Sequence, residues 1–457
     1  MFSTDTYRQR RAALRKAVGS GVLLFLGNDE LGMNYEDNTY DYRQDSSFLY
    51  FFGQPYAGLN AIIDIDNDRE IIFGDELSID HIVWMGNQPT LHEKAALAGI
   101  TETLPAADLK PYLDKVVAGG RKVHYLPTYR GDNKIKLFNL LGVKPGTEQP
   151  SEEFIRAVIN LRNHKTNEEI AEIEKACDVT ADMHITAMKM LREGMREYEI
   201  AAAVEAVARS RGCRLSFPTI ATVNGQTLHN HAYHNIVKPG DMLLLDAGAE
   251  TPEGYAGDMS STICAGKKYT RRQKDVYDIQ VAAHRAAVAA LRPGVPFVDV
   301  YELAARTIVE GLTDLGVMRG NPYDAVAAGA HAMFFPTGLG HMMGMDVHDM
   351  ESLGEVFVGY DGKPKSTQFG RKSLRLARPL EPGFVLTIEP GVYFIPELID
   401  YWGANRHLGD FINYDHLDAW RDFSGVRNEE DYLITADGAR RLGKKIPLTT
   451  EEVEALR

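Results

Sequence analysis

The chain has 457 residues, of which 44% are hydrophobic, enough apolar material for two folded domains. Its 64 acidic and 50 basic residues give a formal net charge of -14, which disfavours a nucleic-acid backbone as ligand and suits divalent cations. No apolar run approaches membrane-spanning length. We therefore expect a soluble globular protein that binds neither nucleic acid nor membrane.

The cysteines and the N-terminus favour a cytoplasmic protein. Cys177, Cys213 and Cys264 are scattered without CxxC spacing, so the sequence indicates neither a disulfide framework nor a thiolate metal site. The apolar run Val22–Leu26 is too short for the core of a signal peptide and leads directly into the polar residues 28–30. We expect a reducing compartment, the cytoplasm.

The N-terminal part of the chain has the pattern of a small α/β domain. Residues 6–17 predict a short charged helix. Trp84 lies in a segment that could belong to the core of this domain or to its rim. From composition alone, packing is the favoured role of a single tryptophan. Five segments have the composition of strands: Val22–Leu26, Phe48–Phe52, Ala61–Ile65, Glu70–Phe73 and Lys122–Leu126.

A domain boundary follows these strands. Residues 144–153 are rich in proline, glycine and charge, and Thr166–Glu169 is a capping box that opens a helix. His184 lies on the apolar side of that helix, where a lone histidine is usually a hydrogen-bonded core residue, so we assign it no role. The sequence predicts an N-terminal domain over 1–160 and a second domain over 161–457.

Three histidines fall within six residues, at His229, His231 and His234. Such a tract can bind metal. The spacing matches neither HExxH nor a zinc-finger pattern, so catalysis or contact with a substrate is the better interpretation.

A hairpin with one acid on each strand comes next. Met242–Leu245 predicts a buried strand that ends in Asp246, and a turn leads to the return strand Tyr255–Ile263, which contains Asp258. Unpaired buried carboxylates are costly, so close carboxylates in an apolar setting share a proton or bind a cation. For this hairpin alone, two solvated turn acids would be the simpler interpretation.

The layout of this hairpin recurs in the second half of the chain. Glu389 follows Pro382-Gly383 at the same spacing as Asp246 follows Pro239-Gly240, with the acid seven residues after the proline each time. An internal repeat of this length predicts two similar α/β units whose acid-bearing strands meet at a shared centre. Such a centre is a place where ions bind.

Two further segments carry polar residues. The segment 338–349 is glycine-rich around His341, but it has one residue too many for GxGxxG and lacks the lysine of a P-loop, so it predicts no nucleotide site. Its glycines instead allow close approach of the backbone. The segment 425–435 is an acidic entry to a strand, which in isolation would be a solvated strand end.

Five motifs, in this order, resemble those of the metallopeptidase family of prolidase and aminopeptidase P: LLLDAG, YAGDMSST, GLGHMMGMDVHD, LTIEPG and GVRNEED. In addition, YRQDSSFLYFFG is similar to the family's N-terminal domain, and residues 161–457 are similar to its pita-bread catalytic domain. The resemblance implies an α/β protein of the α+β type, with a catalytic domain of two similar halves behind a smaller α/β domain.

The resemblance implies two divalent ions per chain. Asp258 and Glu429 would bridge the two ions. Asp246 would bind one ion, and His341 with Glu389 would bind the other. Four carboxylates and one imidazole suit Mn²⁺, with Co²⁺ or Zn²⁺ possible, and do not suit thiophilic ions. Such a metal pair activates water and polarises the scissile carbonyl, so hydrolysis of an acyl bond follows.

The last motif contains two adjacent glutamates and one departure from the family. Glu429 lies two positions after Arg427, as the family's ligand does, and Glu430 would be its neighbour. Asn428 stands where the family usually has an apolar residue. This departure affects the packing of the strand rather than the ligand.

Further roles are implied by the same resemblance. Glu389 would shuttle the proton of the attacking water, and Arg427 would support a ligand or the substrate. His229 and His348 would contact the substrate and the tetrahedral intermediate. The bond implied is Xaa-Pro. Trp84 would approach a neighbour's active site in a homodimer or a pair of dimers.

The two branches of the family share the five ligands and differ in the length of their substrate. The forty-residue gap between Glu389 and Glu429 and the segment 372–378 favour the dipeptidase, prolidase. Arg375 matches an arginine that holds a dipeptide's carboxylate. The alternatives are a surface arginine and an aminopeptidase P acting on longer peptides, whose N-terminal domain is equally similar. A metal-free binding protein or a creatinase-type hydrolase is disfavoured because all five ligand positions are filled.

Overall fold

The computed structural model describes the whole chain, Met1–Arg457, which divides into two compact units. The N-terminal unit consists of Met1–Arg162 with the short segment Met350–Phe357. The C-terminal unit consists of Asn163–Asp349 and Val358–Arg457. None of the helices combines the length and the apolar character that a membrane crossing requires.

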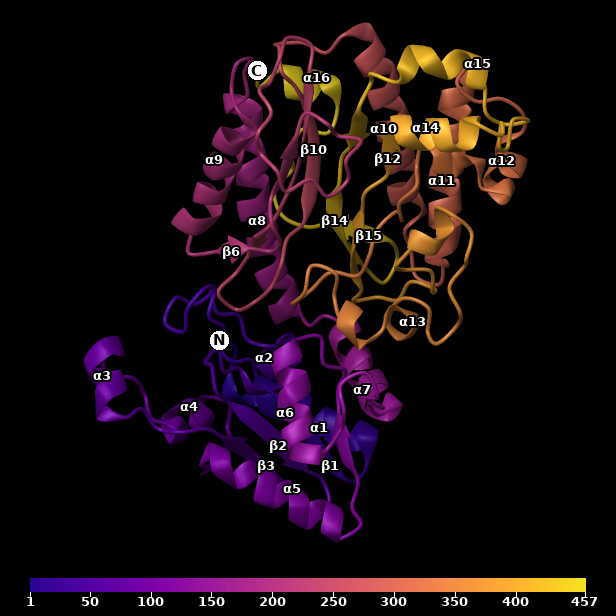
Figure 1. The fold of residues 1–457 in the computed structure, drawn as a ribbon. Coiled ribbons are helices and arrows are strands. Elements are labelled where there is room, and N and C mark those ends of the chain that lie inside the picture. The colour runs from indigo at the N-terminus through magenta and orange to yellow at the C-terminus, as the bar shows by residue number, and fades with distance from the viewer. The chain divides into compact units, whose positions relative to one another are not determined.

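The N-terminal unit is built on a five-stranded mixed sheet (Figure 1). Its strands are β1 (Val22–Leu26), β2 (Asn60–Asp64), β3 (Arg69–Phe73), β4 (Glu102–Leu104) and β5 (Val123–Tyr125). Their order across the sheet is β4-β3-β2-β1-β5, with β1 and β3 antiparallel to β2 and the two outer strands parallel to their neighbours. Its helices are α1 (Thr4–Val18), α2 (Ser46–Phe52), α3 (Ile79–Met85), α4 (Leu91–Leu97), α5 (Leu109–Ala118), α6 (Gly131–Leu141) and α7 (Glu152–Asn163).

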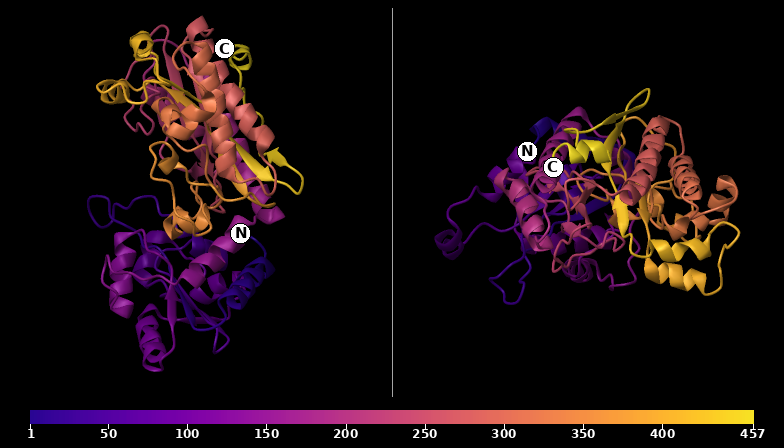
Figure 2. Two further views of the ribbon diagram at one scale, coloured as in Figure 1. Left: turned by 90° about the vertical axis from the view of Figure 1, so that its right-hand side faces the viewer. Right: turned by 90° about the horizontal axis from the view of Figure 1, so that it is seen from above.

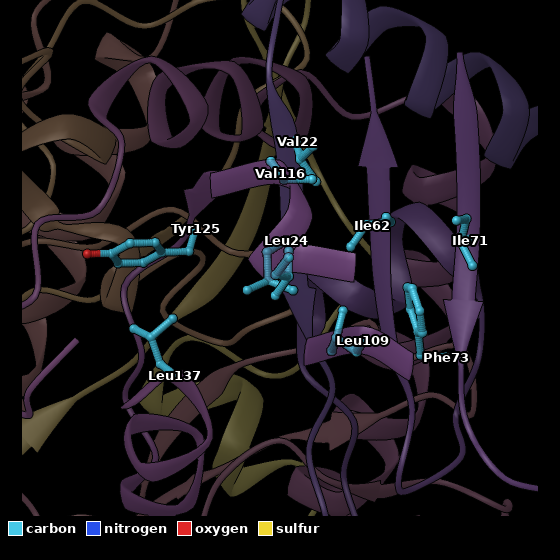
Figure 3. Close-up of a cluster of buried hydrophobic side chains, with 10 residues drawn as sticks. Val22, Leu24, Ile62, Ile71, Phe73, Leu109, Val116, Tyr125 and Leu137 are labelled. Atoms are coloured by element: carbon cyan, nitrogen blue, oxygen red, sulfur yellow. The ribbon is translucent and has the colours of Figure 1, made fainter. Parts of the chain in front are cut away.

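One hydrophobic cluster fixes helices to a face of this sheet. Leu24, Ile62 and Phe73 are buried on neighbouring strands and pack with Leu109 of α5 and Leu137 of α6 (Figure 3). Alternate residues of a strand face the same side, so each strand contributes every second side chain to this core.

The prediction of a strand over Phe48–Phe52 is wrong, because these residues belong to helix α2. The side chain of Asp45 accepts the N–H of Phe48 and caps the helix, and Gly53 ends it in the left-handed region at a φ of 60°. The aromatic run has no alternation of polar and apolar residues, so its two caps decide its conformation. The other four strand predictions and the helix over 6–17 are confirmed to within a few residues.

Helix α3 differs from the other helices of the N-terminal unit in having no buried residue. It stands apart from the sheet at the end of an extended segment (Figure 1). The side chains of Ile79, Val83 and Trp84 are exposed, Trp84 to 85%. The packing role that composition favoured for Trp84 is therefore not fulfilled within this chain.

The C-terminal unit shows the predicted internal repeat. Helices α8 (Asn167–Met190) and α9 (Glu197–Ser210) form one pair, and α10 (Arg271–Ala290) and α11 (Phe297–Asp314) form the other, with α10 and α11 running side by side (Figure 2). Each pair is joined by a turn whose glycine has a positive φ, 86° at Gly194 and 83° at Gly294. The turns before the two acid-bearing strands match likewise, with φ of 85° at Gly240 and 92° at Gly383.

The strands of this unit form small sheets whose ends carry the polar motifs. The three-stranded sheets have the orders β10-β8-β7 and β11-β14-β15, and two ribbons pair β12 with β13 and β6 with β9. These strands are β6 (Arg214–Leu215), β7 (Ile220–Thr222), β8 (Met242–Ala247), β9 (Ala249–Glu250), β10 (Met259–Cys264), β11 (Val385–Ile388), β12 (Gly391–Tyr393), β13 (Gly425–Arg427), β14 (Glu430–Ile434) and β15 (Ala439–Arg441). Short helices complete the unit: α12 (Pro322–Ala328), α14 (Pro396–Gly403), α15 (Tyr414–Leu417) and α16 (Thr450–Glu454). Helix α13 (Glu355–Val358) lies, except for its last residue, in the segment Met350–Phe357 that belongs to the N-terminal unit.

Candidate metal centre

The predicted acid hairpin is formed by β8 and β10, which pair antiparallel with Asp246 opposite Ser260. Asp246 is the second-last residue of β8, and Asp258 directly precedes β10. Both residues are buried, and Oδ1 of each has no hydrogen-bond partner. Buried oxygens of this kind are expected where a cation completes the site.

His341 contributes an imidazole to the same place. Its Nδ1 lies 3.0 Å from the carbonyl oxygen of Met342, which indicates an N–H at Nδ1 and leaves the lone pair at Nε2. Nε2 is 3.4 Å from Oδ2 of Asp258 and 3.6 Å from Oε1 of Glu389. The glycines around this histidine allow the close approach that we predicted, because a Cβ on Gly340 would lie 2.0 Å from the carbonyl oxygen of Thr387.

Glu389 and Glu429 lie opposite each other where two strand pairs meet. β11 pairs with β14 as far as Ile388 and Glu430, and β12 pairs with β13 from Gly391 and Arg427 onward, in one continuous register. Between these pairs the ladder is interrupted. The N–H of Glu389 donates to Leu339 O, and the N–H of Glu429 donates to Ser260 O. Both glutamates are therefore held by segments outside their own strand pair.

Ligand atoms of Asp258, His341 and Glu429 all lie within 4.8 Å of one another. Glu389 joins this group through its contact with His341. The side chain of Glu389 is 20% exposed, whereas that of Asp258 is 7% exposed. One imidazole and several carboxylates are the donor set that Mn²⁺, Co²⁺ and Zn²⁺ accept. The residues present fit a divalent metal.

Arg427 ties Asp246 to this group. Its Nη2 is 2.6 Å from Oδ2 of Asp246, its Nε is 2.9 Å from Ser260 Oγ, and its Nη1 is 2.9 Å from the hydroxyl of Tyr393. Ser260 Oγ in turn donates to Oε2 of Glu429 at 2.7 Å. Burial disfavours the charged guanidinium, but Tyr393 and the surrounding carboxylates outweigh it and raise the pKa of Arg427.

The carboxylates of the group repel one another. Burial raises the pKa of Asp258, with a further contribution from the charge of Asp246. Burial also raises the pKa of Glu429 and of Glu389, to which the charge of Asp258 adds in both cases. Acids that resist ionisation together are the arrangement that divalent cations relieve.

Three further predicted residues lie around this group. The ring centroid of His348 is 4.3 Å from that of His341. The pKa of His229 is lowered, first by partial burial and then by the charges of Arg427, Arg375 and His348. The charges of Arg375 and His348 act on His229 from segments more than a hundred residues away in the sequence.

Other candidate residues lie elsewhere. The carboxylate of Glu430 accepts from the hydroxyl of Tyr432 at 2.8 Å, so this glutamate faces away from its neighbour Glu429. His184 is a buried core residue, as predicted, with its ring nitrogens near Ser261 Oγ and Ala247 O. His231 and His234 are exposed, and so is His229, so burial does not single out one of these three histidines.

Sequence reasoning missed several residues that support the group. Ser260 and Tyr393 both bind Arg427, and the carboxylate of Asp431 accepts the N–H of Asp258 at 3.1 Å and the thiol of Cys177 at 3.1 Å. Ser260 lies within the YAGDMSST motif, two residues after Asp258, which was a usable signal. The partnership of Asp431 with Cys177 joins residues 254 positions apart and left no local pattern.

Comparison with known proteins adds to this geometry. The family described as Metallopeptidase family M24 matches residues 171–436, and Aminopeptidase P, N-terminal domain, matches residues 7–125. The chain is 33% identical to Xaa-Pro dipeptidase of Homo sapiens, over 97% of this chain and 90% of the relative. It is 29% identical to Xaa-Pro aminopeptidase of Escherichia coli (strain K12), over 100% of this chain and 98% of the relative. The solved structure of proline aminopeptidase P II from Yersinia pestis superposes with a TM-score of 0.82 at 27% identity, covering 100% of this chain and 99% of that one.

Proposed function

The chain belongs to metallopeptidase family M24, and from this premise we propose that it hydrolyses Xaa-Pro peptide bonds as a dipeptidase with two divalent ions. The observation that carries the proposal is the buried group of Asp258, His341 and Glu429, extended by Glu389 and by Asp246. We place the boundary between an N-terminal domain and the catalytic domain near residue 160.

We assign the metal ligands as the sequence motifs imply. Asp258 and Glu429 would be shared by the two ions, Asp246 would hold one ion, and His341 with Glu389 would hold the other. Mn²⁺ is the ion that we propose for this donor set, with Co²⁺ and Zn²⁺ as alternatives. When bound, the metal pair supplies an activated water and polarisation of the scissile carbonyl.

The protein's own residues then carry the protons and orient the substrate. Glu389 is the most open of the carboxylates near His341, so it can take a proton from the attacking water and return it to the leaving nitrogen. The pKa of His229 is lowered, which favours the neutral ring, and a neutral ring can offer one N–H to the carbonyl oxygen that becomes negative. His348 contacts the substrate beside it. Arg427 holds Asp246 in place through their ion pair.

The choice of dipeptides as substrates rests on Arg375. Its guanidinium is close enough to His229 to lower that group's pKa, and it can pair with the free carboxylate of a dipeptide. A longer peptide presents a neutral amide at that position. Similarity extends to dipeptidases and aminopeptidases alike, so the presence of Arg375 is the specific argument for the dipeptidase.

The test compares kcat/KM for Ala-Pro and Ala-Pro-Ala in the wild type and in Arg375→Ala. We expect the wild type to prefer Ala-Pro and the variant to lose about 10- to 100-fold on Ala-Pro alone, the value of a charge-assisted contact. Arg378→Ala is the matched control, since Arg378 lies three residues away and pairs with Glu381 at 2.7 Å. A strong preference for Ala-Pro-Ala that Arg375→Ala leaves unchanged would identify an aminopeptidase P instead.

We also propose a homodimer or a pair of dimers in which Trp84 approaches a neighbour's active site. The 85% exposure of this side chain, on a helix without a buried residue, supports a partner for it. Trp84→Ala should weaken self-association in sedimentation and lower turnover together. A monomeric wild type with full activity would contradict this assembly.

A further inference from the structure

The interruption of the sheet at Glu389 and Glu429 leaves backbone groups that the strand ladder does not satisfy. Pro390 follows Glu389 and has no N–H, and in the continuous register it lies opposite Asn428. Pro390 therefore offers no donor to the carbonyl oxygen of Asn428, and the N–H of Asn428 makes no hydrogen bond to Pro390 O, so neither carbonyl has a partner in the ladder. Unsatisfied carbonyls this deep in a protein are costly, so a donor is needed at this point.

A glutamine from helix α10 supplies that donor. Gln280 is fully buried, and its Nε2 donates to Pro390 O at 2.7 Å and to Asn428 O at 3.1 Å. The first carbonyl directly follows Glu389 and the second directly precedes Glu429. One side-chain amide thus joins the backbones of the two strands beside the two glutamates.

The side chain of Asn428 holds this glutamine in place. Its Nδ2 donates to Oε1 of Gln280 at 2.6 Å, and its Oδ1 accepts from the Tyr277 hydroxyl at 2.9 Å and from the N–H of Thr262 at 3.2 Å. Asn428 is 1% exposed. This buried polar side chain therefore has its partners in α10 and β10, and the buried amides form a connected network.

On the basis of the proposed function, we infer that Gln280 and Asn428 are positioning residues for the metal centre. They form an amide clamp, defined by these two side chains, that fixes the distance between the backbones of Glu389 and Glu429. The clamp touches neither carboxylate. It acts through the carbonyl groups of Pro390 and Asn428, which set where each glutamate leaves its strand.

The experiment measures Mn²⁺ binding by metal-stripped protein, through competition with a fluorescent chelator, alongside thermal unfolding in the absence of metal. Gln280→Leu should weaken Mn²⁺ binding about 10- to 100-fold, the usual effect of removing a group that orients metal ligands. Gln273→Leu is the matched control. Gln273 is also buried on α10, and its Nε2 donates to the carbonyl of Gly240 at 2.8 Å, away from the glutamates. The control should lower the melting temperature and leave Mn²⁺ affinity within about twofold.

A double variant tests whether the two residues act as one unit. In Gln280→Leu with Asn428→Leu the Tyr277 hydroxyl and the N–H of Thr262 also lose their acceptor, so the melting temperature should fall below that of Gln280→Leu. Mn²⁺ affinity should stay low in this variant. Wild-type affinity in the double variant, or an equal loss of affinity in Gln273→Leu, would overturn the clamp. Failure of the proposed function would appear in the wild type itself, as absence of Mn²⁺ binding and of Ala-Pro cleavage, whereas failure of the clamp alone requires a wild type that binds and cleaves normally.

Discussion

Replacing Arg427 by methionine should destabilise the metal-stripped protein strongly. The guanidinium and Asp246 form a buried ion pair with 2.6 Å between Nη2 and Oδ2, and their side chains are 4% and 13% exposed. Methionine keeps much of the volume of arginine but leaves the carboxylate without its cation. Removing one partner of a buried pair costs about 3–5 kcal/mol, which for a folding unit of this size corresponds to a fall of about 6–10 °C in melting temperature.

The assay is scanning calorimetry of the protein in excess chelator, with two companion variants. Arg427→Lys keeps the charge but cannot bind Asp246, Ser260 and Tyr393 together, so it should recover only part of the loss. Arg427→Met combined with Asp246→Asn removes the unpaired charge and should melt above Arg427→Met alone.

The reasoning would be refuted if Arg427→Met melted within about one degree of the wild type, since a buried pair of this kind should cost several times more. It would also be refuted if the added Asp246→Asn lowered the melting temperature further. Either result would mean that the charge pair does not hold this part of the fold.

Three further outcomes are expected. A chelator should abolish peptidase activity and Mn²⁺ restore it, and Asp258→Asn and Glu429→Gln should each lose bound metal in elemental analysis; full metal content and turnover in either variant would contradict the bridging assignment. His229→Ala should lower kcat about a hundredfold with metals retained, because a donor to a developing oxyanion is worth about 3 kcal/mol; wild-type turnover would remove His229 from the mechanism. Burial, with the charge of Arg371, lowers the pKa of His331 to about 4. Its contribution to stability is complete above the unfolded value of about 6.5 and falls by about 3 kcal/mol as the pH drops to 4. Over this pH range the urea midpoint of His331→Asn should therefore fall less steeply than that of the wild type. Equal slopes of the urea midpoint against pH in the two proteins would contradict the prediction.

The sequence allowed the repeat, the acid hairpin and the family to be recognised because their signals are local. The spacing from Gly240 to Asp246 and from Gly383 to Glu389 is a property of one turn and one strand. The error at Phe48–Phe52 arose where local signals competed, since an aromatic run suits a strand while its caps, Asp45 and Gly53, suit a helix.

The residues that hold the ligands in place could not be predicted from local signals in the sequence. Asn428 was recognised as a departure, but the partner that explains it, Gln280, lies 148 positions earlier on a helix whose sequence shows no sign of this contact. The ion pair of Lys165 with Asp349, in which both side chains are 1% exposed, likewise joins distant segments. Partners of buried polar groups are chosen by tertiary packing, which a single sequence does not display.

The backbone N–H groups of Glu389 and Glu429 have a consequence for how this unit opens. They bond to Leu339 and Ser260, so each strand that carries a glutamate is fastened to the segment that carries another ligand, His341 in one case and Asp258 in the other. Local unfolding that releases one ligand residue therefore also displaces a second. Ligands should thus be lost in pairs, and amide hydrogen exchange at Glu389 should follow the opening of the His341 segment, as exchange at Glu429 should follow the opening of the Asp258 segment.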